Sequence, residues 1–151
     1  MTLDTLLDEV VRAHFPRPPA TAERIAAFEE RMGWRLDADL RAFYLRCDGA
    51  ELFKPLPDSN YSILSLDDIE RACVRLRRRD QGAPERASFF PLVDCQDSDW
   101  VLVDVTPTGG PYPLLDAYHE TYPREVRRIA ESFQEFLSRA LRGSGHLYWL
   151  E

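Results

Sequence analysis

The sequence predicts a single-domain α+β protein in which helices pack against a mainly antiparallel or mixed β-sheet. Apolar residues recur at helical spacing near both ends of the chain, which is typical of amphipathic helices. Between them, short apolar runs alternate with clusters of turn residues, which is typical of strands joined by tight connections. The length of 151 residues fits one domain, and we treat 1–20 as an N-terminal helix with a proline-rich link and 143–151 as a C-terminal tail.

The first helix is expected directly after Thr2, whose hydroxyl can cap it. Its apolar face consists of Leu3, Leu6, Leu7, Val10 and Val11. The segment PRPP at 16–19 ends this helix, because proline lacks a backbone N–H and clashes with the preceding turn.

Two further helices are expected before residue 50. The first begins after Thr21 and ends at Gly33, and the second begins after Asp37 and is closed by Asp48-Gly49, with Gly49 in the left-handed conformation of a helix stop. Their buried faces are predicted to contain Ile25, Phe28 and Met32, and Leu40, Phe43, Tyr44 and Cys47, respectively.

The period then changes from helix to strand. Strands are predicted at Glu51–Leu56 and Tyr61–Leu64, and a fourth helix begins at Ser65, which has Asp68 three residues later as in a capping box. Leu66, Ile69, Cys73 and Leu76 are expected to line its buried face.

A predicted hairpin, Phe89–Val93 and Trp100–Val105, follows with turn residues between its strands. Another strand is expected at Tyr112–Tyr118, and Ser132 with Glu135 resembles a capping box for a C-terminal helix. The apolar tail after Gly145 can either cover the core or pair with another subunit.

Charge and composition narrow the function. The net charge of −7 disfavours nucleic-acid binding, since phosphate contact needs a basic surface. No apolar run is long enough to span a membrane, and the acidic N-terminal segment is unlike a signal peptide, so we expect a cytoplasmic protein. Lys54 is the only lysine among the 19 basic residues, a bias that indicates a GC-rich bacterial genome.

Catalytic and metal-binding patterns are weak. Cys47, Cys73 and Cys95 lack CxxC spacing and are read as reduced thiols, and we expect no cofactor and no metal. The three histidines fall in no known catalytic pattern, although His119-Glu120 is an open acid–base possibility. The acids Asp94, Asp97, Asp99 and Asp104 are alternatives as oxygen ligands, but they lack EF-hand spacing and are read as a solvated acidic turn.

Several segments together resemble the SUKH superfamily, the Smi/Knr-type domain. They are 39–44 (DLRAFY) followed by Asp48-Gly49, the hairpin at 89–104, and 129–137 (IAESFQEFL). The resemblance covers the chain from about Thr21 onward. Two departures are Asp37, where the family usually has proline, and Asp97-Ser98-Asp99, where it has a glycine-rich turn.

The resemblance implies an α+β domain that recognises other proteins and is not an enzyme. In bacteria such domains commonly serve as immunity proteins that bind and block a cognate polymorphic toxin, often a nuclease or deaminase domain. In fungi, relatives are regulatory adaptors, and a regulatory or scaffold adaptor without a toxin partner is therefore the alternative function.

The candidate binding surface is acidic. From Ala87 to Pro123 the chain has no Lys or Arg, and such a one-signed region can steer a basic partner such as a nuclease toxin. The residues predicted to meet this partner are Asp94, Asp97, Asp99, Trp100, Glu51 and Asp58. Trp100 is a candidate anchor, or else a core residue at the start of a strand.

Arginines form a second charged feature. Arg71, Arg75, Arg78 and Arg79 are predicted on one side of the fourth helix, and Asp67 is positioned to pair with Arg71. This pattern is interpreted as a solvated helix face, with an RNA contact as the alternative that the overall charge opposes.

Overall fold

The computed structural model describes residues 2–53, 61–95 and 99–150 of the chain. Within these ranges the helices are α1 (Leu3–Ala13), α2 (Ala22–Met32), α3 (Ala38–Arg46), α4 (Leu66–Asp80) and α5 (Phe133–Arg142), with 3₁₀ turns η1 (Pro84–Arg86) and η2 (Tyr148–Leu150). The strands are β1 (Phe15–Pro16), β2 (Ala50–Leu52), β3 (Tyr61–Ile63), β4 (Phe89–Asp94), β5 (Trp100–Asp104), β6 (Leu114–Ala117) and β7 (Arg127–Ala130). The predicted α+β class is confirmed.

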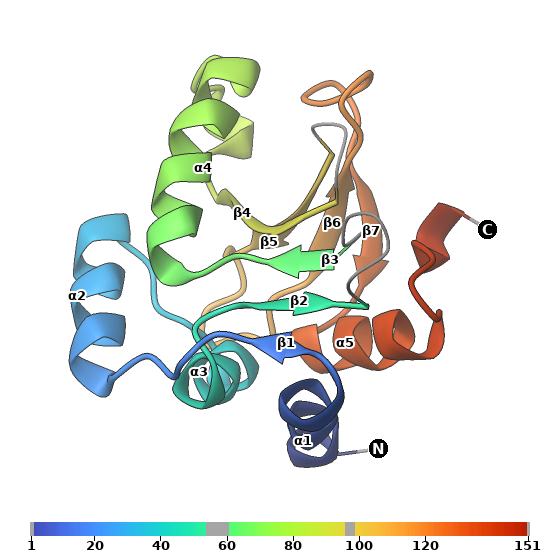
Figure 1. Cartoon of the computed structure of the whole chain (residues 1–151). Helices are drawn as coiled ribbons and strands as arrows, with labels where there is room; N and C mark the ends of the chain where they lie inside the picture. Colours follow the sequence, from blue (N-terminus) through green and yellow to red (C-terminus); the bar gives the residue numbers. More distant parts are fainter. Residues whose placement is uncertain (1, 54–60, 96–98, 151) are drawn as a thin grey trace.

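All the strands form one antiparallel sheet whose spatial order, β1 to β7, is the order along the chain. Each described strand therefore pairs within the sheet with its neighbours in the sequence (Figure 1). The sheet contains two strands that the sequence pattern does not reveal, β1 and β7, and the strand expected at Tyr112–Tyr118 is shorter, spanning Leu114–Ala117.

Helices cover the sheet from two sides. α4 packs on β4 and also contacts α2, while α5 packs on β7 and, together with α1, contacts α3 (Figure 1). The core between these layers is rich in aromatic rings: Phe28, Phe43, Tyr44, Tyr61, Phe133 and Phe136 are fully buried. Two of them also join α3 to α5, since the Phe43 and Phe133 rings lie 5.2 Å apart, edge to face.

Local capping determines where the helices begin. Asp37 and Ser132 accept hydrogen bonds from the backbone N–H groups of Leu40 and Glu135, at 2.9 and 3.1 Å. Thr2, Thr21 and Ser65 cap α1, α2 and α4 in the same way. All five predicted N-caps are thus confirmed.

Gly49 has a different role from the predicted helix stop. α3 ends at Arg46, and its C-cap residue Cys47 is extended, so Gly49 lies beyond the helix end. The left-handed conformation of Gly49 (φ 92°) brings its backbone against the segment that follows β3. A Cβ there would lie 2.7 Å from the Ile63 oxygen and 2.8 Å from the Ser65 nitrogen, so only glycine fits this close approach.

Both outer strands of the sheet are modified at their free edges. β1 has only two residues, and one of them, Pro16, has no backbone N–H to donate. On β7 the carbonyl of Ile129 accepts a 2.8 Å hydrogen bond from the Tyr148 hydroxyl. The Arg127 and Arg128 side chains of β7 are exposed.

The C-terminal tail covers the core. Trp149 is 4% exposed and packs its ring 6.0 Å from that of Tyr61 and 6.2 Å from that of Phe136. Leu150, in contrast, is 66% exposed. Of the two possibilities open for the tail, the structure shows the intramolecular one.

Candidate protein-binding surface

A row of residues crosses six strands of the sheet in register. Phe15 lies opposite Glu51, Glu51 opposite Ser62, Ser62 opposite Asp94, Asp94 opposite Trp100, and Trp100 opposite Ala117. Directly opposed residues of neighbouring strands point to the same face of a sheet. We call these six residues the cross-strand row; it brings together Glu51, Asp94 and Trp100, which the sequence separates by up to 49 positions.

The cross-strand row lies on the α4 face of the sheet. Arg75 of α4 stacks over the ring of Trp100, whereas Tyr61, which alternates with Ser62, packs against Phe136 of α5 on the opposite face. Towards β1 the row is accessible, because Glu51, Ser62 and Asp94 are half-buried and Phe15 is 49% exposed. This end combines two carboxylates with an exposed aromatic ring.

Trp100 is buried beneath two arginines of α4. Its side chain is 5% exposed, and the guanidinium carbons of Arg75 and Arg79 lie 5.5 and 5.8 Å from its ring centroid. A partner that approaches this end of the row meets the arginines before the indole. Of the two alternatives for Trp100, the core residue at the start of a strand describes its position. Its ring supports the guanidinium groups of Arg75 and Arg79 at the surface.

Asp99 lies apart from the cross-strand row. It precedes Trp100 by one residue, and its carboxylate accepts hydrogen bonds from the backbone N–H of His119, at 2.8 Å, and pairs with His119 Nδ1 at 2.7 Å. It is also close enough to Asp116, on the α5 side of the sheet, to contribute to a raised pKa of that carboxyl. The acids predicted as one surface are thus divided between two regions.

The remaining predicted acids fall into two groups. Asp58 and Asp97 lie outside the described residues. Asp104, considered as a metal ligand, instead accepts hydrogen bonds from the backbone and side chain of Thr106 and the hydroxyl of Ser88, which closes a local turn. Across the described ranges no three His, Cys, Asp or Glu side chains are grouped so that they could hold a metal ion.

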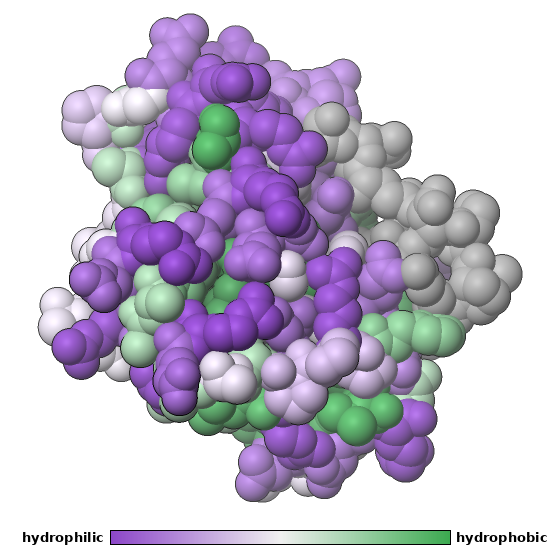
Figure 2. Space-filling model, turned by 60° about the vertical axis from the view of Figure 1, so that its left-hand side comes forward, coloured by the Kyte–Doolittle hydropathy of each residue, from purple (hydrophilic) through white to green (hydrophobic). Residues whose placement is uncertain are grey.

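Ion pairs neutralise the N-terminal half of α4. Arg24 and Arg31 of α2 pair with Asp67 and Glu70 at 3.4 and 2.8 Å, and Arg17 pairs with Asp68 at 2.9 Å. Arg71 pairs with Asp68 at 2.7 Å, so the predicted Asp67–Arg71 pair is wrong. Figure 2, which views the molecule from the α2 and α4 side, shows a mostly hydrophilic surface there.

The C-terminal half of α4 is different. Arg75 and Arg78 are exposed, and neither makes an ion pair within the part of the chain that the structure describes. Asp68, Arg75 and Arg79 occupy positions i, i+7 and i+11, which lie on one side of a helix. That side faces the cross-strand row, because Arg75 and Arg79 both stack on Trp100.

Two of the three histidines, His14 and His119, have structural partners in different parts of the fold. His14 Nδ1 accepts a hydrogen bond from the backbone N–H of Phe53 at 3.1 Å, and partial burial lowers the pKa of His14. His119 pairs with Asp99, whereas Glu120 accepts a 2.7 Å hydrogen bond from the Tyr118 hydroxyl. The considered His119-Glu120 acid–base pair therefore does not form.

Hollows in the described surface are lined by a few titratable groups. One of about 380 Å³ lies between the starts of α3 and α5 and is lined by Asp37, Asp39, Gly110 and Ser132, among others. Burial raises the pKa of Asp37, but both oxygens of this carboxylate are occupied, one by the N–H of Leu40 and the other by the N–H of Tyr112 at 2.8 Å. Asp37 thus serves as a structural cap that also fastens the 109–112 loop.

The sequence model of the SMI1 / KNR4 family (SUKH-1) matches residues 19–139. Because this match covers well over half of the chain, the protein belongs to the SMI1 / KNR4 family (SUKH-1). A comparison with curated protein sequences gives no match. None of the described helices is both long and apolar enough to cross a membrane.

Sequence reasoning missed three contributors to this surface. Phe15 and Ser62 join it only through strand register, and β1, which contains Phe15, is too short to give a periodic signal. Arg75 was recognised as part of a charged helix face, but its position above Trp100 depends on how α4 packs. The sequence offered one signal, an aromatic residue next to a proline, and it identifies Phe15 only once the strand register is known.

Proposed function

We propose that this protein is a bacterial immunity protein that acts in the cytoplasm, where it binds and neutralises a cognate toxin domain. The accessible end of the cross-strand row, with Glu51 and Asp94 in register, is the observation that carries the proposal. Membership of the SMI1 / KNR4 family supports a role in protein recognition.

Charge supports a basic partner. Glu51 and Asp94 are separated by one residue, Ser62, across the row, and the protein carries a net charge of −7. A nuclease or another phosphate-binding toxin needs a basic surface, and an acidic inhibitor accelerates encounter with such a surface and competes with its substrate. Asp58, Asp97 and Asp99 remain part of the proposed acidic field, but Glu51 and Asp94 carry the direct contact.

The exposed ring of Phe15 supplies an apolar element beside these charges. It lies directly opposite Glu51 and is 49% exposed. The cores of protein interfaces are enriched in aromatic residues, Phe among them, and are surrounded by a polar rim. In this proposal Phe15, and not the buried Trp100, is the aromatic residue that enters the partner.

Co-expression tests the function. The product of the neighbouring gene is induced alone and together with this protein, and growth is scored. Rescue of growth supports an immunity function. A neighbouring product that is harmless, together with capture of a housekeeping complex in pull-downs, would favour the regulatory adaptor instead.

The surface is tested by association kinetics at low salt. The double variant Glu51→Gln with Asp94→Asn is expected to slow association roughly tenfold, and the difference should shrink as salt is added. Glu30→Gln with Glu85→Gln is the matched control, because both of these acids are exposed and lie outside the cross-strand row. An unchanged association rate for the first double variant would remove the row from the proposal.

A further inference from the structure

The surface that contains the cross-strand row changes sign at Trp100. On β2 and β4 it presents Glu51 and Asp94, and on α4 it presents Arg75 and Arg79 above the indole. Asp94 and Trp100 are register partners on adjacent strands, so the acidic and basic regions adjoin each other. Neighbouring strands are about 4.8 Å apart, which puts Glu51 and Trp100 within about 15 Å.

A stable interface is large enough to cover both the acidic and the basic part of this surface. A specific complex buries about 800 Å² on each partner, which corresponds to a patch roughly 30 Å across. A partner that covers Glu51 and Asp94 with a patch of this size also covers the adjoining side of α4. Arg75 then becomes part of the same interface.

Arg75 is suited to a defined contact there. It is exposed, it makes no ion pair in the described ranges, and its guanidinium carbon lies 5.5 Å from the centroid of Trp100. Stacking on an indole limits the rotamers of the side chain and leaves its N–H groups available to donate hydrogen bonds to a carboxylate. Arg78, one turn further along α4, is also exposed and without an ion pair in the part of the chain that is described.

We infer that the partner bound by the cross-strand row carries an acidic group beside its basic patch, and that this group meets Arg75. This inference rests on the proposed function and specifies its partner. The two opposite contacts set the orientation of the complex, since rotating the partner by half a turn would place like charges together. Complementary charge patterns of this kind provide specificity more than affinity.

The charge-reversal variant Arg75→Glu distinguishes this inference from simple long-range attraction. Adding negative charge to an acidic protein should strengthen binding to a partner that is uniformly basic. If an acidic group faces Arg75, the same variant must weaken binding, and we expect roughly a tenfold rise in Kd at low salt. The sign of the change therefore decides between the two.

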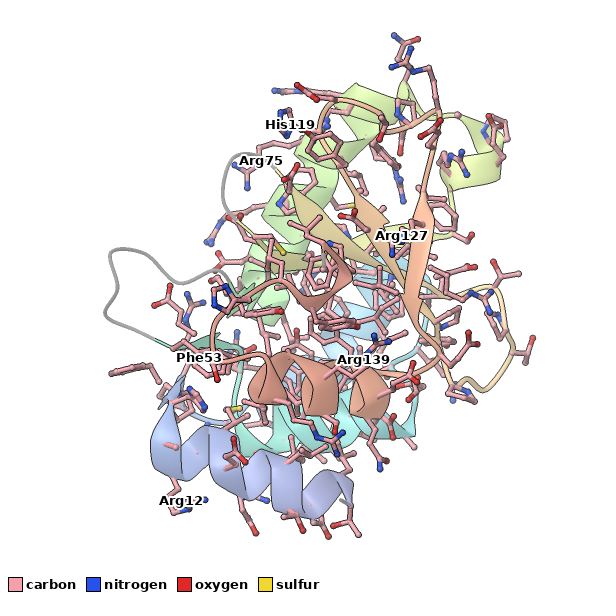
Figure 3. The ribbon with its side chains drawn as sticks, turned by 90° about the vertical axis from the view of Figure 1, so that its right-hand side faces the viewer. Arg12, Phe53, Arg75, His119, Arg127 and Arg139 are labelled. Atoms are coloured by element: carbon pink, nitrogen blue, oxygen red, sulfur yellow. The ribbon has the colours of Figure 1, made fainter. Side chains whose placement is uncertain are left out.

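The matched control is Arg12→Glu. Arg12 is an exposed arginine of α1, and Figure 3 shows it at the end of the molecule opposite to Arg75. The Arg12→Glu variant changes the net charge by the same amount as Arg75→Glu does, and its Kd should be unchanged or slightly lower. Arg75→Lys retains the charge and should retain most of the affinity. Arg78→Glu is the substitute test if Arg75→Glu proves unstable, because it disrupts no described ion pair or ring contact. It should also raise Kd.

Kd is measured with the purified product of the neighbouring gene as the probe. Weaker binding for Arg75→Glu but not for Arg12→Glu supports the inference. Unchanged or tighter binding for Arg75→Glu, with slower association for the Glu51 and Asp94 variant, overturns it and leaves the proposed function intact. If the neighbouring product neither binds nor is neutralised, the proposed function fails and the inference fails with it. A 20-nucleotide RNA that binds the free protein through Arg75 would also overturn it, in favour of nucleic acid.

Discussion

The Tyr122 hydroxyl donates a 2.8 Å hydrogen bond to the carboxylate of Asp80, which is 2% exposed at the C-terminal end of α4. The same carboxylate accepts the N–H of Gly82 at 2.9 Å and pairs with Arg77, also at 2.9 Å. Burial, followed by this contact with Asp80, raises the pKa of Tyr122. One buried carboxylate thus joins α4 to the segment that precedes β7.

Removal of the Asp80 carboxylate should be costly. Asp80→Ala leaves three donors without their acceptor, so we expect a loss of about 3–5 kcal/mol in the free energy of unfolding. Tyr122→Phe removes one hydrogen bond and should cost about 1–2 kcal/mol. Urea titration measures both, and the exposed Glu85→Ala provides the control. Equal losses for Asp80→Ala and Glu85→Ala would show that the buried network does not stabilise the fold.

Gly49→Ala should destabilise the protein more than Gly33→Ala. Both glycines have positive φ, but a Cβ at Gly49 would meet two backbone atoms within 3 Å, whereas one at Gly33 meets nothing within 4 Å. We expect a loss of about 3 kcal/mol at Gly49 and about 1 kcal/mol at Gly33. Thermal unfolding followed by circular dichroism compares the two variants. If they lose stability equally, the close approach at Gly49 is relieved by a shift of the backbone.

Asp116→Asn should stabilise the protein at neutral pH. Burial, with a smaller contribution from Asp99, raises the pKa of Asp116, so the folded state holds this proton to a higher pH than the unfolded state does. Stability is therefore lost as the pH rises through the interval from the unfolded pKa to the higher folded pKa. Asparagine keeps an acceptor for the side-chain hydrogen bond with Trp149 but has no proton to lose.

The gain in melting temperature for Asp116→Asn should be small near pH 4 and should increase towards neutral pH. Arg127, opposite Asp116 on β7, lowers the pKa of this carboxyl and serves as the converse test. Arg127→Gln should lower the melting temperature at pH 7 more than at pH 4. A gain for Asp116→Asn that is the same at every pH would exclude ionisation as its cause.

Trp149→Ala should lower the free energy of unfolding by about 3–5 kcal/mol, because it removes a large buried ring that packs against both Tyr61 and Phe136. Leu150→Ala should change the free energy of unfolding by less than about 0.5 kcal/mol, since Leu150 is exposed. Chemical denaturation measures both values. Comparable values would mean that the tail does not close the core in solution.

Local signals made much of the fold predictable. The five helix starts follow from a capping hydroxyl or carboxylate and the apolar period after it, all within a few residues. β7 escaped prediction because Arg127 and Arg128 are both exposed, so its sequence lacks the alternation of a half-buried strand. Gly49 was identified as left-handed, but its reason, the approach to Ile63, is a long-range contact.

The candidate surface was less predictable because it depends on register. Composition identified Glu51, Asp94 and Asp99 as acidic, but only strand pairing shows that the first two share a row. Asp99 lies one residue from Trp100, and alternation along the strand is enough to separate it from Asp94. The burial of Trp100 depends on two arginines from a helix, which no local pattern around residue 100 reveals.

The blocked margins of the sheet limit how this protein can meet others. At one edge of the sheet Pro16 has no N–H to donate. At the other edge the Ile129 carbonyl already accepts a hydrogen bond from the Tyr148 hydroxyl. Both features interrupt the hydrogen-bond ladder that an extended peptide from another chain would join, and they disfavour the stacking of copies into fibrils as well. Partners are therefore expected to be recognised through side-chain contacts. One substitution at the surface can then change which partner binds while the backbone of the fold stays the same.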